Sequence, residues 1–182
     1  EAAGNIFAAL ESRWEGVDIL VLNASVQLPG PWEEVTPNSF DRQMHVNVLS
    51  SILLIQKAVP YMARRGFGRI VTIGSVQEHK PLPTMLAYAA SKAAQTMLVK
   101  TLAAPLAPQG ITVNNVAPGV ILTDRNTEAL ADAAYAQKVR SLIPAGFFGE
   151  AEDCVGPVLL LCSQAGRYIT GESLLADGGK AL

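Results

Sequence analysis

Four short apolar segments, separated by longer helical patterns, constrain the fold more than any other feature of this chain. Residues 17–22 and 69–74 are almost continuously apolar, as are strands covered on both faces of a parallel sheet. Residues 111–116 are half polar and residues 173–176 form a shorter run. Strands that alternate with helices at this spacing predict an α/β fold with a parallel sheet.

The segments between these strands carry helical signals. Thr36-Pro37 is typical of an N-cap followed by proline at the first helical position, and Gly66 ends the helix that follows. Apolar residues recur there every three or four positions, at Phe40, Met44, Val48, Ile52, Ile55, Val59 and Met62. Pro60 is expected to kink its last turns. Further helices are predicted over residues 1–14, 84–109, 126–140 and 151–163.

Composition fits one globular domain. The 182 residues are 49% hydrophobic and 16% charged, too apolar for a disordered chain. The net charge of −2 indicates no basic face for nucleic acid. No apolar run approaches the roughly 18 residues of a membrane span, so no membrane partner is expected. The first residues lack a Met and a signal-peptide pattern and start in mid-pattern, so we expect a longer working protein.

Polar and turn-forming residues follow three of the strands. They are Asn23-Ala24-Ser25, Ser75 and Pro118-Gly119. In open α/β sheets, ligands bind outside the carboxyl ends of the strands, although Asn and Ser also end strands simply because they favour turns. These positions are therefore candidates for a binding crevice.

Tyr88 and Lys92 give a sharper signal. Four residues along a helix place two side chains on one face, one above the other. The pair follows Ser75 by 13 residues and opens a predicted helix. Asn47 adds a polar group inside the apolar helix, where Asn lowers helix propensity. Asn47 is therefore a functional residue, a helix-surface residue or a hydrogen-bonded core amide.

As a set, these motifs resemble the classical short-chain dehydrogenase/reductase family over essentially the whole chain. The matches are Leu22-Asn23-Ala24-Ser25 for NNAG, Val46-Asn47-Val48 for the helix asparagine, Ile73-Gly74-Ser75 for the serine, Tyr88-Ala89-Ala90-Ser91-Lys92 for YxxxK, residues 115–123 for PGxxxT and Asp177-Gly178-Gly179 for DGG. The resemblance implies a doubly wound, Rossmann-like sheet. Residues 1–182 would then be the C-terminal portion of a single domain that lacks the family's first three strands and two helices.

Two departures from the family pattern stand out. Ser25 replaces the last glycine of NNAG, and the TGxxxGxG loop is absent from the 182 residues. That loop holds the cofactor pyrophosphate at a helix N-terminus, so the chain carries the catalytic half of the site without the phosphate cradle. Without a neighbouring strand, residues 17–22 would form a bare hydrophobic edge.

The resemblance implies hydride transfer between NAD or NADP and an alcohol or ketone substrate, with no metal. Tyr88 would be the general acid/base. Lowering its pKa from about 10 to about 7 requires roughly 4 kcal/mol, which Lys92 and the oxidised nicotinamide would supply. Ser75 would orient the substrate carbonyl, and Asn47 would hold a water that links Lys92 to solvent.

The same resemblance implies a set of cofactor-binding residues. Tyr88 and Lys92 would contact the nicotinamide ribose. Asn23 and Ala24 would line the adenosine side, Ser25 next to them would also contact the cofactor, and Pro118, Gly119, Ile121 and Thr123 would flank the nicotinamide. Substrate contacts are expected from residues 77–86 and from a lid over residues 122–147.

Two other interpretations stay open. The chain is a non-catalytic relative or fragment kept as an interaction module, or it is a sugar-nucleotide epimerase, which shares YxxxK. The small and apolar surfaces of helices 37–65 and 84–109 predict a homodimer or homotetramer. Cys154 and Cys162 are expected to be unbridged, as in a reducing cytoplasm, and His45 and His79 are expected to be bystanders.

Overall fold

The computed structural model describes residues 2–182, apart from the side chains of residues 125, 128 and 129. Its sheet has four parallel strands in the order β1-β2-β3-β4. They are β1 (Ile19–Leu22), β2 (Gly68–Ile73), β3 (Ile111–Pro118) and β4 (Ser173–Ala176). Since all four strands run in parallel, their carboxyl ends lie at one edge of the sheet. The predicted doubly wound parallel α/β fold is confirmed.

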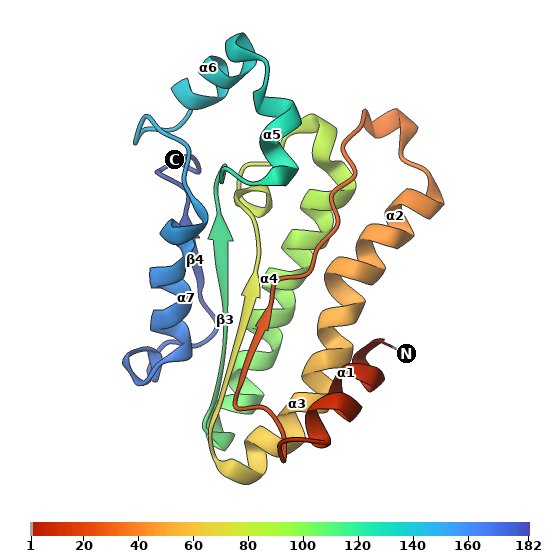
Figure 1. Cartoon of the computed structure of the whole chain (residues 1–182), viewed down its shortest axis with the longest axis vertical. Helices are drawn as coiled ribbons and strands as arrows, with labels where there is room; N and C mark the ends of the chain where they lie inside the picture. The colour runs from red at the N-terminus through yellow and green to blue at the C-terminus, as the bar shows by residue number, and fades with distance from the viewer. Residues whose placement is uncertain (1) are drawn as a thin grey trace.

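Helices cover both faces of this sheet (Figure 1). The helices α1 (Ala2–Glu11), α2 (Pro37–Met44), α3 (Ser50–Arg65) and α4 (Leu86–Leu106) lie on one side, and α7 (Val155–Cys162) lies on the other. Successive side chains of a strand point to opposite faces, so Ile70 packs in the core on the α3–α4 side while Val71 packs with Leu161 of α7. This double burial explains why the strand sequence is continuously apolar.

The inner strand β3 and the edge strand β1 differ in burial. β3 is buried from Ile111 to Ala117 despite its half-polar sequence, because Asn114 bonds to the main chain of Ile169 and Glu172. β1 forms an edge of the described sheet. The side chains of Ile19 and Val21 are 44% and 41% exposed there, so the strand predicted to be apolar on both faces is only half covered.

Several helices are shorter or more divided than their sequence patterns predict. The first ends at Glu11, and Trp14 lies beyond it, exposed. The stretch predicted over residues 126–140 is two helices, α5 (Asp124–Leu130) and α6 (Ala133–Ser141). They separate because Asp132 accepts hydrogen bonds from Ala134 N and Tyr135 N and so starts a new helix. Both lie beyond the carboxyl end of β3 (Figure 1).

Short 3₁₀ turns account for the remaining differences. Around α4 they are η4 (Pro83–Met85) and η5 (Ala107–Gln109), and η6 (Ala151–Cys154) precedes α7. Pro157 is the third residue of α7, within its first turn, where a missing N–H costs no helical bond.

The helix that follows Thr36 contains a feature that periodicity did not reveal. Between α2 and α3 the chain forms a π-helical turn, η2 (His45–Leu49), with Asn47 at its centre. The Thr36 cap predicted from the sequence is confirmed, and the helix continues through Pro60 until Gly66. π turns inside α-helices frequently accompany functional sites.

This long helix also has the length and composition to cross a membrane. Among the described residues, Pro37–Arg65 is the one stretch of this kind, with a mean hydropathy of 1.3. The finding is weak evidence for a span, because core helices of soluble proteins pass the same test. Its buried face carries the polar residues Gln43, Asn47 and Ser51, all of them hydrogen-bonded within the protein.

Candidate active site

Helix α4 brings Tyr88 and Lys92 together in the interior. Tyr88 is 5% exposed and Lys92 is 1% exposed, and Lys92 Nζ lies 5.6 Å from the centre of the Tyr88 ring. A buried ammonium needs acceptors. Here it donates 2.7 Å to the Ile73 carbonyl and 3.0 Å to Gln95 Oε1. Lys92 is therefore fixed against the carboxyl end of β2.

Ser75 follows the same strand end. Its backbone is extended, and its side chain caps the short turn η3 (Val76–Glu78) by accepting a 3.2 Å bond from Gln77 N. A hydroxyl that accepts this bond still has its own hydrogen to donate. Since Lys92 bonds to Ile73, two residues before Ser75, the two predicted catalytic residues meet at one end of β2.

Asn47 is a hydrogen-bonded core amide. It is fully buried, accepts a 2.8 Å bond from Val26 N, and donates to Val26 O and Ser91 Oγ at 2.9 and 2.8 Å. Both amide hydrogens are thus in use, so a relay water would have to bond to the side-chain oxygen or to the main-chain carbonyl. The side chain links the loop after β1 to the turn of α4 that carries Tyr88 and Lys92.

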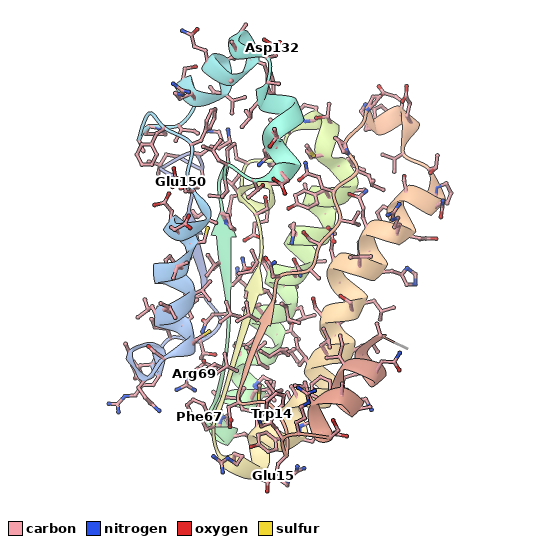
Figure 2. The ribbon with its side chains drawn as sticks, in the orientation of Figure 1. Trp14, Glu15, Phe67, Arg69, Asp132 and Glu150 are labelled. Atoms are coloured by element: carbon pink, nitrogen blue, oxygen red, sulfur yellow. The ribbon has the colours of Figure 1, made fainter. Side chains whose placement is uncertain are left out.

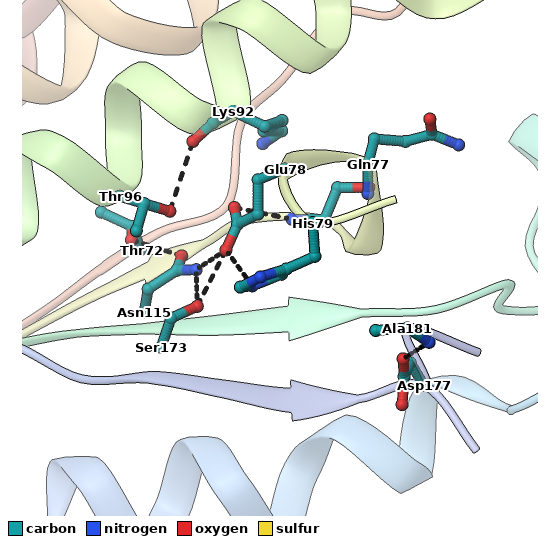
Figure 3. A network of polar contacts seen from close by, with 11 residues as sticks. Thr72, Gln77, Glu78, His79, Lys92, Thr96, Asn115, Ser173, Asp177 and Ala181 are labelled. Carbon is teal, nitrogen blue, oxygen red and sulfur yellow. Dashed lines mark hydrogen bonds and ion pairs between the residues drawn. The ribbon is translucent and has the colours of Figure 1, made fainter. Parts of the chain in front are cut away.

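Glu78 is the centre of a second polar network, which sequence analysis missed (Figure 3). Its side chain is 2% exposed. Its Oε1 accepts bonds of 2.8 Å from both Asn115 Nδ2 and Ser173 Oγ and lies 3.3 Å from His79 Nε2. Its Oε2 accepts from the Ser75 amide at 3.4 Å. One carboxylate therefore ties the Ser75 turn to β3 and β4.

A sequence signal for Glu78 was available. Ser75 and Glu78 are spaced as a capping box, in which serine and glutamate three residues apart satisfy each other's backbone amides, and both bonds are present. His79, expected to be a bystander, contacts this carboxylate. Among the described residues there is no group of three His, Cys, Asp or Glu side chains that could hold a metal ion.

The expected cofactor residues lie at the carboxyl ends of β1 and β3. Asn23, Ala24 and Ser25 form the loop after β1, where the first two are exposed. Pro118 ends β3, and Gly119 N donates to Ala176 O at 2.9 Å. A Cβ on Gly119 would lie 2.7 Å from Asp177 Cα, so this close approach of two main chains requires glycine.

The segments beyond Gly119 and Ala176 are held by local bonds. Ile121 O accepts from Asn126 Nδ2 at 2.8 Å, and the Thr123 carbonyl accepts from Asn126 N at 2.8 Å. The Asp177 carboxylate accepts from Gly179 N and Ala181 N at 2.9 and 2.7 Å (Figure 3). Each predicted site segment is thus an ordered turn at the same edge of the sheet.

Burial lowers the pKa of two further basic side chains. Arg69 stacks on the Phe67 ring at 4.4 Å and lies at the end of the molecule opposite Asp132 (Figure 2). Its burial lowers the pKa of the guanidinium. Near Asp177, burial lowers the pKa of the Lys180 ammonium, and the charge of Lys80 lowers it further.

Comparison with known proteins decides the family. The family model for enoyl-(acyl carrier protein) reductases matches residues 1–181. "Dehydrogenase/reductase SDR family member 4" of Sus scrofa is 39% identical over 167 residues, which is 91% of this chain. The chain belongs to the short-chain dehydrogenase/reductase family. It spans 60% of the length of that relative and 59% of the human one, to which it is 38% identical.

Solved structures of this short-chain dehydrogenase/reductase family have the same fold. A 3-oxoacyl (acyl-carrier-protein) reductase from Agrobacterium tumefaciens, with NADP bound, is 38% identical, with a TM-score of 0.92 over 98% of this chain and 69% of the other. A gluconate 5-dehydrogenase from Burkholderia cenocepacia, in complex with NADP and tartrate, is 34% identical, with a TM-score of 0.94 over 98% and 70%. The structural similarity to these two enzymes therefore covers nearly the whole chain.

Proposed function

We propose that this chain is the catalytic region of an NAD(P)-dependent oxidoreductase that interconverts an alcohol and a ketone. The observation that carries the proposal is the buried Lys92 ammonium, held 5.6 Å from the Tyr88 ring and bonded to the strand end that leads to Ser75. A cation beside a phenol favours the phenolate. This is the requirement for a tyrosine that takes and returns a proton near neutral pH.

Each residue of the proposed tetrad has a distinct task. Tyr88 would give a proton to the carbonyl oxygen during reduction and remove it from the hydroxyl during oxidation. The Ser75 hydroxyl would donate a hydrogen bond to the same oxygen and orient it. Lys92 would lower the pKa of Tyr88, and Asn47 would hold the loop after β1 and α4 at a fixed separation and support a relay water through its carbonyl groups.

The residues at the carboxyl edge suit a nicotinamide dinucleotide. The Lys92 ammonium is a strong donor for ribose hydroxyls, the loop 23–25 offers exposed polar groups, and Gly119 allows close approach of main chain. Ser25, Pro118, Ile121 and Thr123 would complete the contacts. The nicotinamide would supply or accept the hydride. Relatives with NADP bound support NADP as a cofactor, and NAD stays an alternative.

Assembly and location belong to the same proposal. Apolar side chains of α2, η2, α3 and α4 are exposed, among them Phe40, Leu49, Leu53, Leu86 and Met97. Ala93 is exposed one turn before Met97 on α4, where a small side chain permits close helix approach. A homodimer or homotetramer formed through these helices would cover this surface, and sedimentation of the full-length protein tests it. The two free thiols support a cytoplasmic location.

The decisive experiment replaces Tyr88 with phenylalanine in the full-length protein. Reduction of a panel of ketones, including keto acids, is followed through NADPH and NADH absorbance. The variant should keep nucleotide binding and lose about 10²- to 10⁴-fold in kcat, the usual contribution of general acid/base catalysis. Tyr61→Phe is the matched control, because Tyr61 lies on α3 away from Lys92. Near-normal turnover by Tyr88→Phe would reject the proposed role, and absence of nucleotide binding in the parent protein would favour a non-catalytic module.

A further inference from the structure

Lys92 is connected to the π turn by a chain of buried hydrogen bonds. Lys92 Nζ donates to Gln95 Oε1 at 3.0 Å, and Gln95 Nε2 donates to Ser51 Oγ at 3.3 Å. Ser51 Oγ then donates to the Asn47 carbonyl at 3.3 Å. Lys92 and Ser51 are 1% and 2% exposed and Gln95 is fully buried. This series of hydrogen bonds runs from α4 to α3 and ends at the backbone carbonyl of Asn47 in η2.

The chemistry of the groups fixes the direction of every bond in this chain. An ammonium donates and never accepts, so the Gln95 amide must turn its oxygen to Lys92 and its nitrogen to Ser51. The Ser51 hydroxyl, having accepted that bond, donates onward to the Asn47 carbonyl. All three bonds therefore run away from the cation. Bonds aligned in this way polarise one another and stabilise positive charge at their start.

We propose that Gln95 is a positioning residue that holds the Lys92 ammonium 5.6 Å from the centre of the Tyr88 ring and bonded to the Ile73 carbonyl. Lysine has a long, flexible side chain with a point charge, and burial alone does not select one rotamer. The two acceptors found on Ile73 and Gln95 lie on different elements, so together they define where the ammonium sits. This inference rests on the proposed function of Tyr88 and Lys92.

The test compares three variants of the full-length protein. Gln95→Leu keeps the volume and removes the acceptor, whereas Gln95→Glu keeps an acceptor of the same shape. Gln43→Leu is the control, because Gln43 is a glutamine on α2 that is 1% exposed and bonds to Leu28 N rather than to Lys92. For each variant, kcat, the KM for nucleotide and the melting temperature are measured, and Tyr88→Phe is assayed alongside.

We expect Gln95→Leu to lose about 10- to 100-fold in kcat/KM, which is the size of one hydrogen bond to a charged group. The loss should exceed that of the Gln43→Leu control at equal or smaller loss of melting temperature, and Gln95→Glu should restore most of the rate. Similar kcat/KM in Gln95→Leu and the parent protein, with Tyr88→Phe inactive, would overturn the inference and leave the proposed function intact.

A readout without turnover separates the two failures. A crystal structure of nucleotide-free Gln95→Leu should show the Lys92 ammonium displaced from its 2.7 Å bond to the Ile73 carbonyl. An unmoved ammonium would overturn the inference whatever the activity of the parent protein. An active Tyr88→Phe together with a displaced ammonium would reject the proposed function and keep Gln95 as the residue that positions Lys92.

Discussion

Asn47 donates a 2.8 Å hydrogen bond to Ser91 Oγ, and this bond joins the π turn of one helix to the turn of α4 that carries Tyr88 and Lys92. Ser91 Oγ in turn donates to the Tyr88 carbonyl at 2.7 Å. Through these two hydrogen bonds, Ser91 fixes the turn of α4 that carries Tyr88 and Lys92 relative to Asn47. A π turn at residues 45–49 changes the direction of the side chains along the helix, and here it places Asn47 fully in the interior.

Asn47→Ala should destabilise the folded protein and lower its activity together. The change removes one acceptor and two donors, which leaves the Val26 main chain and Ser91 without those partners. A buried group without its partner costs about 1–3 kcal/mol, so we expect the free energy of unfolding to fall by about 2–4 kcal/mol. Urea denaturation measures this. A loss below about 0.5 kcal/mol would show that the three bonds contribute little.

Glu78→Gln should weaken the carboxylate network and, through the Ser75 turn, the proposed tetrad. The two carboxylate oxygens accept bonds from the Ser75 main chain, Asn115 and Ser173. An amide has one acceptor oxygen and presents its NH₂ to another donor, so we expect about 1–3 kcal/mol of destabilisation and a lower kcat. Ser173→Ala, which removes a single donor, should cost about 1 kcal/mol. Equal effects of the two variants would contradict the central position of Glu78.

The sequence predicts the fold more completely than it predicts the site. Apolar runs and capping residues were sufficient for all four strands and for the helix that starts at Thr36, because these signals are local. The π turn, the Glu78 network and the Gln95 chain were not predicted. The Glu78 network and the Gln95 chain depend on bonds between residues 37 to 95 positions apart, and a buried Gln or Glu looks like a surface residue in sequence. The helix predicted over residues 126–140 is divided because the Asp132 cap starts a new helix within the periodic pattern, and the first helix ends before Trp14.

Gly74→Ala should disturb the site through a steric clash. A Cβ at Gly74 would lie 2.5 Å from Asn115 Nδ2 and 2.6 Å from Glu78 Oε2, closer than any real contact. The network must therefore open next to Ser75. We expect about 1–3 kcal/mol of destabilisation with reduced kcat. Gly156→Ala is the control: it meets nothing within 4 Å in helix α7 and should be neutral or stabilising by about 0.5–1 kcal/mol. Similar thermal stability of the two variants would contradict the clash.

Lys92→Ala should impair both cofactor binding and chemistry, because the proposal assigns Lys92 to the ribose hydroxyls and to Tyr88. We expect a fall in kcat of about 10²-fold or more and weaker binding of NADPH in fluorescence titration. Lys100→Ala is the matched control, since Lys100 lies exposed on the same helix. If the Lys92 variant bound nucleotide as tightly as the parent protein, the ribose contact would be wrong while the role toward Tyr88 would stand on kcat alone.

The two cysteines should react as free, slow thiols. Cys154 and Cys162 lie at opposite ends of α7 and are unbridged, as the helical spacing predicted. Burial raises the pKa of both thiols, with a further rise at Cys154 from Asp153 and an opposing effect of Arg69 at Cys162. Because the thiolate is the reactive form, modification near pH 7.5 should be slower in the folded than in the urea-unfolded protein. The folded state favours the neutral thiol, so this contribution to stability is full below the ordinary thiol pKa of about 8.5 and is lost as the pH rises above it.

Titration with a chromogenic disulfide reagent measures these thiols without reductant. Two thiols per chain are expected after unfolding, and the rate of the folded protein should keep rising with pH beyond the point where the rate of the unfolded protein levels off, because burial raises the pKa of both thiols. Cys162→Ser should retain the slower phase that belongs to Cys154, because at Cys162 the positive charge of Arg69 opposes the effect of burial. Folded and unfolded rates that coincide at pH 7.5 would contradict the burial of the thiols. A bridge between Cys154 and Cys162, detected by mass, would contradict the helix that separates them.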